Sequence, residues 1–156
     1  HRIVELGKSV LQHPVELLPG AREAVARVAA DRRVVLITKG DLFHQERKVT
    51  VSGLADLFQR IEIVSEKDER SYARLLAEFG VEPRAFAMVG NSVKSDCLPV
   101  LALGGFAVHV PYPLLWDLEV VEQDAPHPRL GAVASIAEVP LELGRLVAAA
   151  AGETHA

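Results

Sequence analysis

Four short apolar runs, at residues 34–37, 61–64, 86–89 and 106–110, constrain the fold of this chain more than any other feature. Each run is rich in β-branched or aromatic residues and has the length of a strand. The runs are mostly continuous rather than alternating with polar residues, which is typical of strands covered on both faces. They therefore predict a parallel sheet.

Segments with helical spacing lie between and around these runs. Residues 21–29, which follow Gly20, place alanines and valines on one face, and residues 140–150 do the same with leucine, valine and alanine. Between the second and third runs, apolar residues repeat at i, i+3, i+4 and i+7: Tyr72, Leu75, Leu76 and Phe79. Strands that alternate with helices predict right-handed βαβ crossovers. The expected fold class is α/β, a doubly wound Rossmann-like parallel sheet with helices on both faces.

Length, charge and cysteine content exclude several classes of protein. The chain has 156 residues, which suits one domain, and a net charge of -4, which gives no footprint for nucleic acid. No apolar run approaches the roughly 20 residues that span a bilayer, and no basic amphipathic segment suits a membrane surface. The single cysteine, Cys97, excludes an internal disulfide and a cysteine-based zinc site. Because no secretory signal is present, we expect a cytoplasmic location and neither a nucleic-acid nor a membrane partner.

The residues that follow each run are the candidates for a site, because ligands of parallel sheets bind at the carboxyl ends of the strands. Thr38, Lys39 and Gly40 come directly after the first run. A hydroxyl there can donate to an anion oxygen, and a glycine lets backbone N–H groups approach closely. The alternative interpretation is an ordinary turn into the next helix.

Ser65, Glu66 and Lys67 follow the second run and begin the next helical segment. A lysine is unfavourable at a helix N-terminus, where the helix dipole prefers an anion. A bound anion would satisfy both the lysine and the dipole, so this local conflict indicates an anion site. A solvated surface lysine is the alternative interpretation.

The third run ends at Gly90, and a polar stretch from Asn91 to Asp96 follows it. Oxygen donors together with a carboxylate suit a hard cation such as Mg²⁺, with Asp96 as a direct or water-mediated ligand and Asn91 offering its side-chain carbonyl. The alternative is a helix cap, for which asparagine and serine also serve. The length of the polar stretch favours a site.

The order hydroxyl, lysine and Gly-Asn-Ser…Asp at successive strand ends resembles the haloacid dehalogenase-like (HAD) hydrolase superfamily, over about residues 18–146. The resemblance implies that Thr38, with Lys39 and Gly40, binds the phosphoryl group. It implies that Lys67 offsets the charge on nucleophile and phosphate. Finally, it implies that the fourth motif, through Asp96 and Asn91, holds Mg²⁺.

Two features depart from the family pattern. The fourth motif usually begins with aspartate, and this chain has Asn91 there, which lowers the charge at the cation by one. An asparagine in this region also resembles the dehalogenase branch, which needs no metal, although Gly90 and the Ser95-Asp96 pair are closer to the phosphatase-like branch. The family's nucleophile lies in an Asp-x-Asp motif on an N-terminal strand, and this sequence contains no such motif.

We therefore expect an incomplete HAD core. The family's central strand, between the first and third runs, and its two aspartates would lie upstream. Residues 1–16 would end a helical cap, and 17–156 would form the core without its N-terminal strand. The chain alone would then be inactive.

The leading hypothesis is a Mg²⁺-dependent phosphatase that acts on a small phosphorylated metabolite. It would use an aspartyl-phosphate intermediate whose aspartate lies outside the chain. The alternatives are a haloacid dehalogenase-type hydrolase and a non-catalytic HAD-like binding domain. The sequence indicates neither the substrate nor an oligomeric state.

Three further side chains and one segment complete the expectations. His44 is interpreted as a solvated helix histidine, and Cys97, which has no adjacent base, as a small buried residue. His109 ends the fourth run and is a candidate to line the cleft. The proline-rich stretch 111–128 is expected to be irregular.

Overall fold

The structure is a computed structural model that describes residues 17–111 and 126–153. The predicted end of a helical cap (1–16) and most of the predicted irregular stretch (111–128) lie outside the described residues. Within these limits, no helix is long and apolar enough to cross a membrane.

Five strands follow one another along the described chain: β1 (Val35–Lys39), β2 (Arg60–Val64), β3 (Ala87–Gly90), β4 (Phe106–His109) and β5 (Leu130–Ala132). The four predicted strands are confirmed, with ends shifted by at most two residues. The sequence does not predict β5, because a glycine interrupts its three residues and leaves no apolar run. Thr38 and Lys39, expected just after the first strand, form its last two residues.

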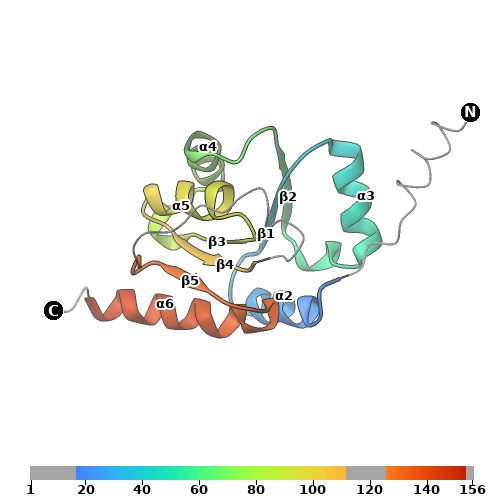
Figure 1. The fold of residues 1–156 in the computed structure, drawn as a ribbon. Coiled ribbons are helices and arrows are strands. Elements are labelled where there is room, and N and C mark those ends of the chain that lie inside the picture. Colours follow the sequence, from blue (N-terminus) through green and yellow to red (C-terminus); the bar gives the residue numbers. More distant parts are fainter. Residues whose placement is uncertain (1–16, 112–125, 154–156) are drawn as a thin grey trace, which may run out of the picture.

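The strands form two parallel sheets in the part of the chain that the structure describes (Figure 1). β1 pairs with β2 in the register Thr38↔Ile63, β3 pairs with β4 in the register Gly90↔His109, and β5 extends the second sheet. Because every pair is parallel, the carboxyl ends within each sheet lie at one edge. Among the described residues, no ladder joins β1 to β3.

Helices cover both faces of the strands (Figure 1). On one side lie α4 (Glu69–Phe79) and α5 (Leu98–Ala102), and on the other lie α2 (Ala21–Ala29) and α6 (Val139–Glu153). The helix α3 (Leu42–Ser52) follows β1, and a π-helix (Val93–Cys97) leads directly into α5. This arrangement confirms the predicted α/β fold class and the three predicted helices.

The signals that bound α4 act as the sequence predicts. Asp68 is its N-cap, and the carboxylate accepts from the Ser71 N–H at 2.8 Å. That hydrogen bond lowers the pKa of the Asp68 carboxyl. At the other end, Gly80 has a φ of 66°, the left-handed conformation that glycine adopts without strain. Lys67 therefore lies just outside the helix, one residue before its cap.

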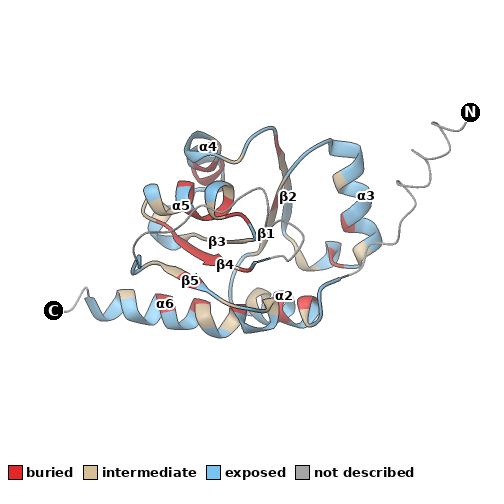
Figure 2. Cartoon of the chain, viewed as in Figure 1, coloured by how far each residue is buried: buried red, intermediate tan, exposed pale blue. Residues whose placement is uncertain are grey.

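Two apolar clusters hold the layers together. Figure 2 shows buried residues along the strands and on the helices that cover them. One joins β1, β2 and β3 to α4 and α5 through Ile37, Val64, Tyr72, Leu75, Met88 and Val100. The other packs α6 against β4 and the residue after it through Phe106, Val108, Val110, Val139, Leu143 and Leu146. Because the first cluster contains residues of both sheets, apolar side-chain packing connects them where no ladder does.

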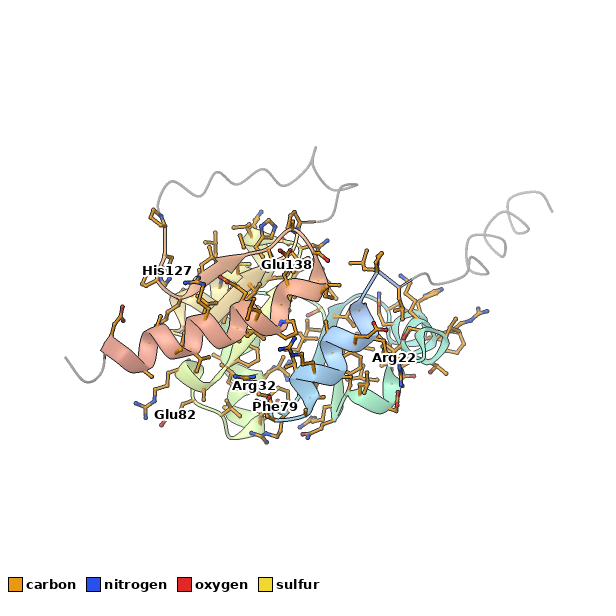
Figure 3. The ribbon with its side chains drawn as sticks, turned by 90° about the horizontal axis from the view of Figure 1, so that it is seen from below. Arg22, Arg32, Phe79, Glu82, His127 and Glu138 are labelled. Carbon is orange, nitrogen blue, oxygen red and sulfur yellow. The ribbon has the colours of Figure 1, made fainter. Side chains whose placement is uncertain are left out.

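The helix α2 ties the β1–β2 unit to the opposite side of the molecule. Val28 packs against the cluster under α6. At the other end of the helix, the Arg22 guanidinium donates to the Gly53 carbonyl oxygen and, at 3.3 Å, to an Asp56 carboxylate oxygen (Figure 3). The helix thus bridges the segment after α3 and the layer formed by α6.

Candidate active site

The candidate site lies at the carboxyl ends of the strands, where the three predicted polar segments are found. Lys67 follows β2, and Asp96 lies in the π-helix that follows β3. The Lys67 ammonium donates to Asp96 Oδ1 at 2.7 Å. This contact joins the edges of the two sheets, and it brings together two of the residues that the sequence selects.

The Lys67–Asp96 pair is almost removed from water. The side chains are 17% and 2% exposed, respectively. Desolvating two charges is unfavourable unless good geometry and further hydrogen bonds satisfy them. Asp96 Oδ2 meets that condition by accepting from the Ser92 N–H at 3.1 Å. Both carboxylate oxygens therefore have charge-assisted or backbone donors.

Gly90 makes room for the Asp96 carboxylate at the end of β3. A Cβ atom at this position would overlap the carboxylate group, so no larger residue fits without displacing Asp96. The glycine that closes the third apolar run is therefore required by close approach of a side chain. The sequence places this glycine in the site but does not reveal that reason.

The π-helix fixes the polar stretch that precedes Asp96. The Ser92 carbonyl oxygen accepts from the Asp96 N–H at 2.8 Å and from the Cys97 N–H at 3.3 Å. Ser92 Oγ accepts from the Ser95 N–H at 3.2 Å and from the Ser95 hydroxyl at 2.7 Å. Ser92 thus caps a helical turn, as the alternative interpretation holds, while Asp96 faces Lys67.

Asn91 is exposed, and its backbone carbonyl oxygen lies 3.1 Å from His109 Nε2. Since a carbonyl accepts only, Nε2 carries the proton in this contact. His109 therefore lies at the same edge as Gly90 and Asn91. Within the described residues, no group of three or more His, Cys, Asp or Glu side chains is arranged to hold a metal ion. Magnesium binding by Asp96 and Asn91 stays a prediction.

Thr38, Lys39 and Gly40 form a second polar cluster at the end of β1. Thr38 Oγ1 lies 3.3 Å from Gln45 Oε1, to which it donates. Lys39 Nζ donates to both oxygens of the Glu66 carboxylate, at 2.9 and 2.8 Å. Gly40 has a φ of 139°, and the Gln45 amide packs closely against it. The structure therefore engages these residues with Gln45 and Glu66 rather than with the Lys67–Asp96 pair.

A cavity of about 700 Å³, open to solvent, is lined by residues of both clusters. Both lysines of the predicted phosphate site reach it. Its lining residues are Lys39, Glu66, Lys67, Asp68, Glu69, Lys94, Ser95, Leu98, Pro99 and Ala102. Charged side chains form one part of the lining and α5 supplies apolar residues, so the cavity suits a small polar molecule with a short apolar portion.

Two buried groups beside Asp96 are held in their neutral forms. Burial, with a smaller contribution from the Asp96 charge, raises the pKa of the Cys97 thiol to about 12. Burial likewise raises the pKa of the Tyr72 phenol far above its ordinary value, with smaller contributions from Asp96 and Cys97. Cys97 is fully buried, as predicted, and its protonated thiol is a poor nucleophile.

His44 contacts the cap of α3. Its ring Nδ1 lies 3.0 Å from Asp41 Oδ1, and the same oxygen accepts from the His44 N–H at 3.2 Å. Asp41 is the N-cap of α3, and the hydrogen bond from the His44 N–H lowers the pKa of its carboxyl. An exposed helix histidine is thus what the structure shows, as the sequence predicts.

Sequence reasoning misses three residues that contact the predicted site. Glu66 and Gln45 carry no signal of their own, because their partners follow from how β1 and β2 pair and how α3 turns back over β1. Tyr72 is predicted as a core residue from helical spacing. Its hydroxyl, however, donates to the Ser95 carbonyl oxygen at 2.9 Å, inside the π-helix. A hydroxyl-bearing tyrosine on an otherwise apolar face is the one sequence signal that points to such a bond.

Comparison with known protein families decides the classification. A sequence model described as haloacid dehalogenase-like hydrolase matches residues 3–104. The chain belongs to this family. The chain is also similar to the crystal structure of a haloacid dehalogenase-like family hydrolase from Xanthomonas campestris, which is 52% identical and has a TM-score of 0.84. The match covers 94% of this chain and 62% of that protein, so the chain spans less than two thirds of its relative.

More distant HAD structures share the fold at low sequence identity. A 2-haloacid dehalogenase from Pseudomonas syringae pv. Tomato is 19% identical over 91% of this chain and 60% of its own, with a TM-score of 0.69. A predicted phosphoglycolate phosphatase from Haemophilus somnus is 17% identical over 88% and 61%, with a TM-score of 0.68. No curated protein gives a significant match.

Proposed function

We propose that this chain is the anion-binding part of a Mg²⁺-dependent HAD phosphatase that acts on a small phosphorylated metabolite. The observation that carries the proposal is the Lys67–Asp96 pair, 2.7 Å apart and nearly buried where the strands end. Buried ion pairs contribute little net stability, so a pair at the ligand-binding edge of an α/β sheet favours a role in chemistry.

The residues of this chain are proposed to bind and stabilise the phosphoryl group. Lys67 lines the cavity and offers its ammonium to negative charge that develops during transfer, while Asp96 fixes the position of that ammonium. Thr38 is proposed to turn its hydroxyl from Gln45 to a phosphoryl oxygen, helped by backbone N–H groups at Lys39 and Gly40. The 3.3 Å contact with Gln45 is long for a hydrogen bond between oxygens, which makes this exchange inexpensive.

The metal is proposed to bind beside Asp96. Carboxylate and amide oxygens are the donors that Mg²⁺ prefers, and Asp96 with Asn91 offers one of each. These donors suit the ion but do not complete its coordination, so we propose that an aspartate outside this chain and water supply the rest. Mg²⁺ would polarise a phosphoryl oxygen and neutralise its charge. A distant relative, the HAD-hydrolase YfnB from Bacillus subtilis, is described as bound to magnesium.

The nucleophile is proposed to lie on a strand between β1 and β3. Those strands have no ladder to each other among the described residues, although residues of both belong to one apolar cluster. An aspartate carboxylate at the end of such a strand would attack phosphorus, and the bond to the leaving oxygen would break. A second aspartate would protonate that oxygen, and water would then hydrolyse the aspartyl phosphate.

A haloacid dehalogenase-type reaction is the second candidate, and Asn91 favours it. An asparagine where most phosphatases of the family have aspartate lowers the negative charge available to a cation. The Pseudomonas syringae 2-haloacid dehalogenase shares the fold of this chain. In this reaction Lys67 would stabilise a substrate carboxylate instead of a phosphoryl group.

The test measures release of phosphate from p-nitrophenyl phosphate by the full-length protein, with any sequence upstream of His1. We expect turnover that requires Mg²⁺ and that falls about 100-fold or more in Lys67→Ala. The matched control is Lys48→Ala, which removes an exposed lysine of α3 and should retain activity.

The outcomes separate the candidate functions. Metal-independent release of chloride from 2-chloropropionate, without phosphatase activity, would establish the dehalogenase reading. Absence of both activities, in a full-length protein that carries an Asp-x-Asp motif, would contradict both enzymatic hypotheses and favour a binding domain.

A further inference from the structure

Tyr72 is a buried residue of α4 whose hydroxyl has a specific partner in another element. The side chain is 1% exposed, and the ring packs in the apolar cluster shared by β1, β2, β3, α4 and α5. Its hydroxyl donates to the Ser95 carbonyl oxygen at 2.9 Å. A phenol in such a cluster needs a hydrogen-bond partner, but the partner here lies in the segment that carries Asp96.

Further hydrogen bonds, linked through the covalent structure of Ser95 and Ser92, lead from this contact to Lys67. Ser95 uses its N–H and its hydroxyl on Ser92 Oγ, at 3.2 and 2.7 Å. The Ser92 N–H donates to Asp96 Oδ2 at 3.1 Å, and Asp96 Oδ1 accepts from Lys67 at 2.7 Å. The side chains of Tyr72, Ser95, Ser92 and Asp96, with backbone groups of Ser95 and Ser92, thus connect α4 to the ammonium at the edge of the cavity.

The segment at the centre of this network has a backbone that needs support. Val93–Cys97 is a π-helix, a conformation that is rare and concentrated at functional sites. It contains one residue more per turn than an α-helix would, and each helical residue turns the side chains that follow by about 100°. Relaxation to an α-helical turn would therefore rotate Asp96 away from its place over Gly90.

We propose that Tyr72 is a positioning residue of the candidate active site. Its hydroxyl holds the Ser95 carbonyl, which keeps the π-helix in place, and the π-helix aims the Asp96 carboxylate at Lys67. The kinetic half of this proposal rests on the proposed function. The family likeness gives roles to Lys67 and Asp96, whereas the role of Tyr72 follows from its contacts.

The test is Tyr72→Phe in the full-length protein. This change removes one oxygen and keeps the ring, including its contact with Phe86 at 6.5 Å between centroids. We expect kcat with p-nitrophenyl phosphate to fall on the order of tenfold, because a misdirected charge stabilises the transition state less. KM should change less than about twofold, because the residues that bind phosphate remain.

A second measurement does not depend on activity. The free energies of unfolding in urea of wild type, Tyr72→Phe, Asp96→Asn and the double variant form a thermodynamic cycle. If the hydroxyl acts through Asp96, the effect of Tyr72→Phe should drop to about half or less in the Asp96→Asn background. A hydroxyl that only satisfies a core contact would give additive effects.

Ser52→Ala is the control for loss of a hydroxyl. Ser52 donates to the Val49 carbonyl oxygen at 2.6 Å at the end of α3, outside the network. Ser52→Ala should leave kcat unchanged, and its effect on stability should add to the effect of Asp96→Asn. The positioning role would be overturned if the stability effects of Tyr72→Phe and Asp96→Asn were additive. It would also be overturned if those effects were coupled but Tyr72→Phe kept the kcat of wild type. If the protein has no phosphatase activity, the cycle alone decides whether Tyr72 positions Asp96.

Discussion

Two lysine–carboxylate pairs lie at the ends of neighbouring strands, and they differ far more in environment than in geometry. Lys67 and Asp96 are 2.7 Å apart, with side chains 17% and 2% exposed. Lys39 and Glu66 are 2.8 Å apart, with side chains 53% and 64% exposed. The closest N···O distances differ by 0.1 Å, so distance cannot distinguish the pairs.

The surroundings of the two pairs indicate different uses. Asp96 has a backbone donor, a glycine that yields space and a π-helix that carries it, so its position is determined from several sides. Lys39 and Glu66 meet in water and can separate at little cost. A fixed pair suits preorganised charge in a reaction, whereas an exposed pair at the same cavity suits contact with an entering ligand.

The largest effect should come from removing one partner of the buried pair. Asp96→Asn leaves the Lys67 ammonium mostly buried without a counter-charge, and we expect it to lower the free energy of unfolding by about 3 kcal/mol. Glu66→Gln, the same change in the exposed pair, should cost less than about 1 kcal/mol. Urea unfolding of both variants measures the difference, and equal losses would contradict the contrast between the pairs.

A smaller effect should come from filling the space beside the buried carboxylate. Gly90→Ala places a methyl group where the Asp96 carboxylate lies, and overpacking of this kind costs about 2 kcal/mol. Gly144→Ala is the matched control, because no atom lies within 4 Å of its added Cβ in α6. That change should stabilise the protein by about 0.5–1 kcal/mol, since alanine favours helix. A Gly90→Ala protein as stable as wild type would show that Asp96 is not fixed there.

Local patterns were sufficient to predict most of the fold. The strands β1 to β4 are short runs of β-branched and aromatic residues, and Asp68 and Gly80 bound α4 as their chemistry predicts. The sequence does not predict β5, because it is three residues long and is a strand through its pairing with β4.

The same patterns select candidate residues but do not predict all of the contacts that these residues make. Strand ends select Lys67 and Asp96, and the structure brings these two residues into contact, since parallel topology brings such ends together. The pairing of Lys39 with Glu66 depends on side-chain directions that no spacing rule specifies. The hydrogen bond of the Tyr72 hydroxyl is not predicted, because helical periodicity indicates which face is buried and not which partner a side-chain hydroxyl finds.

The smallest expected effect concerns Cys97, which adjoins Asp96 and tests how strongly the buried region resists a second negative charge. The unfolded thiol ionises near pH 9, while burial, followed by the Asp96 charge, holds the native pKa at about 12. Above pH 9 the unfolded chain therefore binds fewer protons than the native protein, so stability falls as pH rises. From pH 8 to pH 10 this thiol alone should lower the free energy of unfolding by about 1.4 kcal/mol.

Urea unfolding at pH 8 and pH 10 measures this loss, and Cys97→Ala should remove that part of it. Burial is the largest cause of the raised pKa, so the native thiol stays protonated at pH 10 without the Asp96 charge, and Asp96→Asn, like Glu66→Gln, should leave this loss nearly unchanged. A pH dependence that is identical in wild type and Cys97→Ala would mean that the thiol ionises in the native protein. In that case water would reach the region around Asp96, and the Lys67–Asp96 pair would not differ from the Lys39–Glu66 pair in its access to solvent.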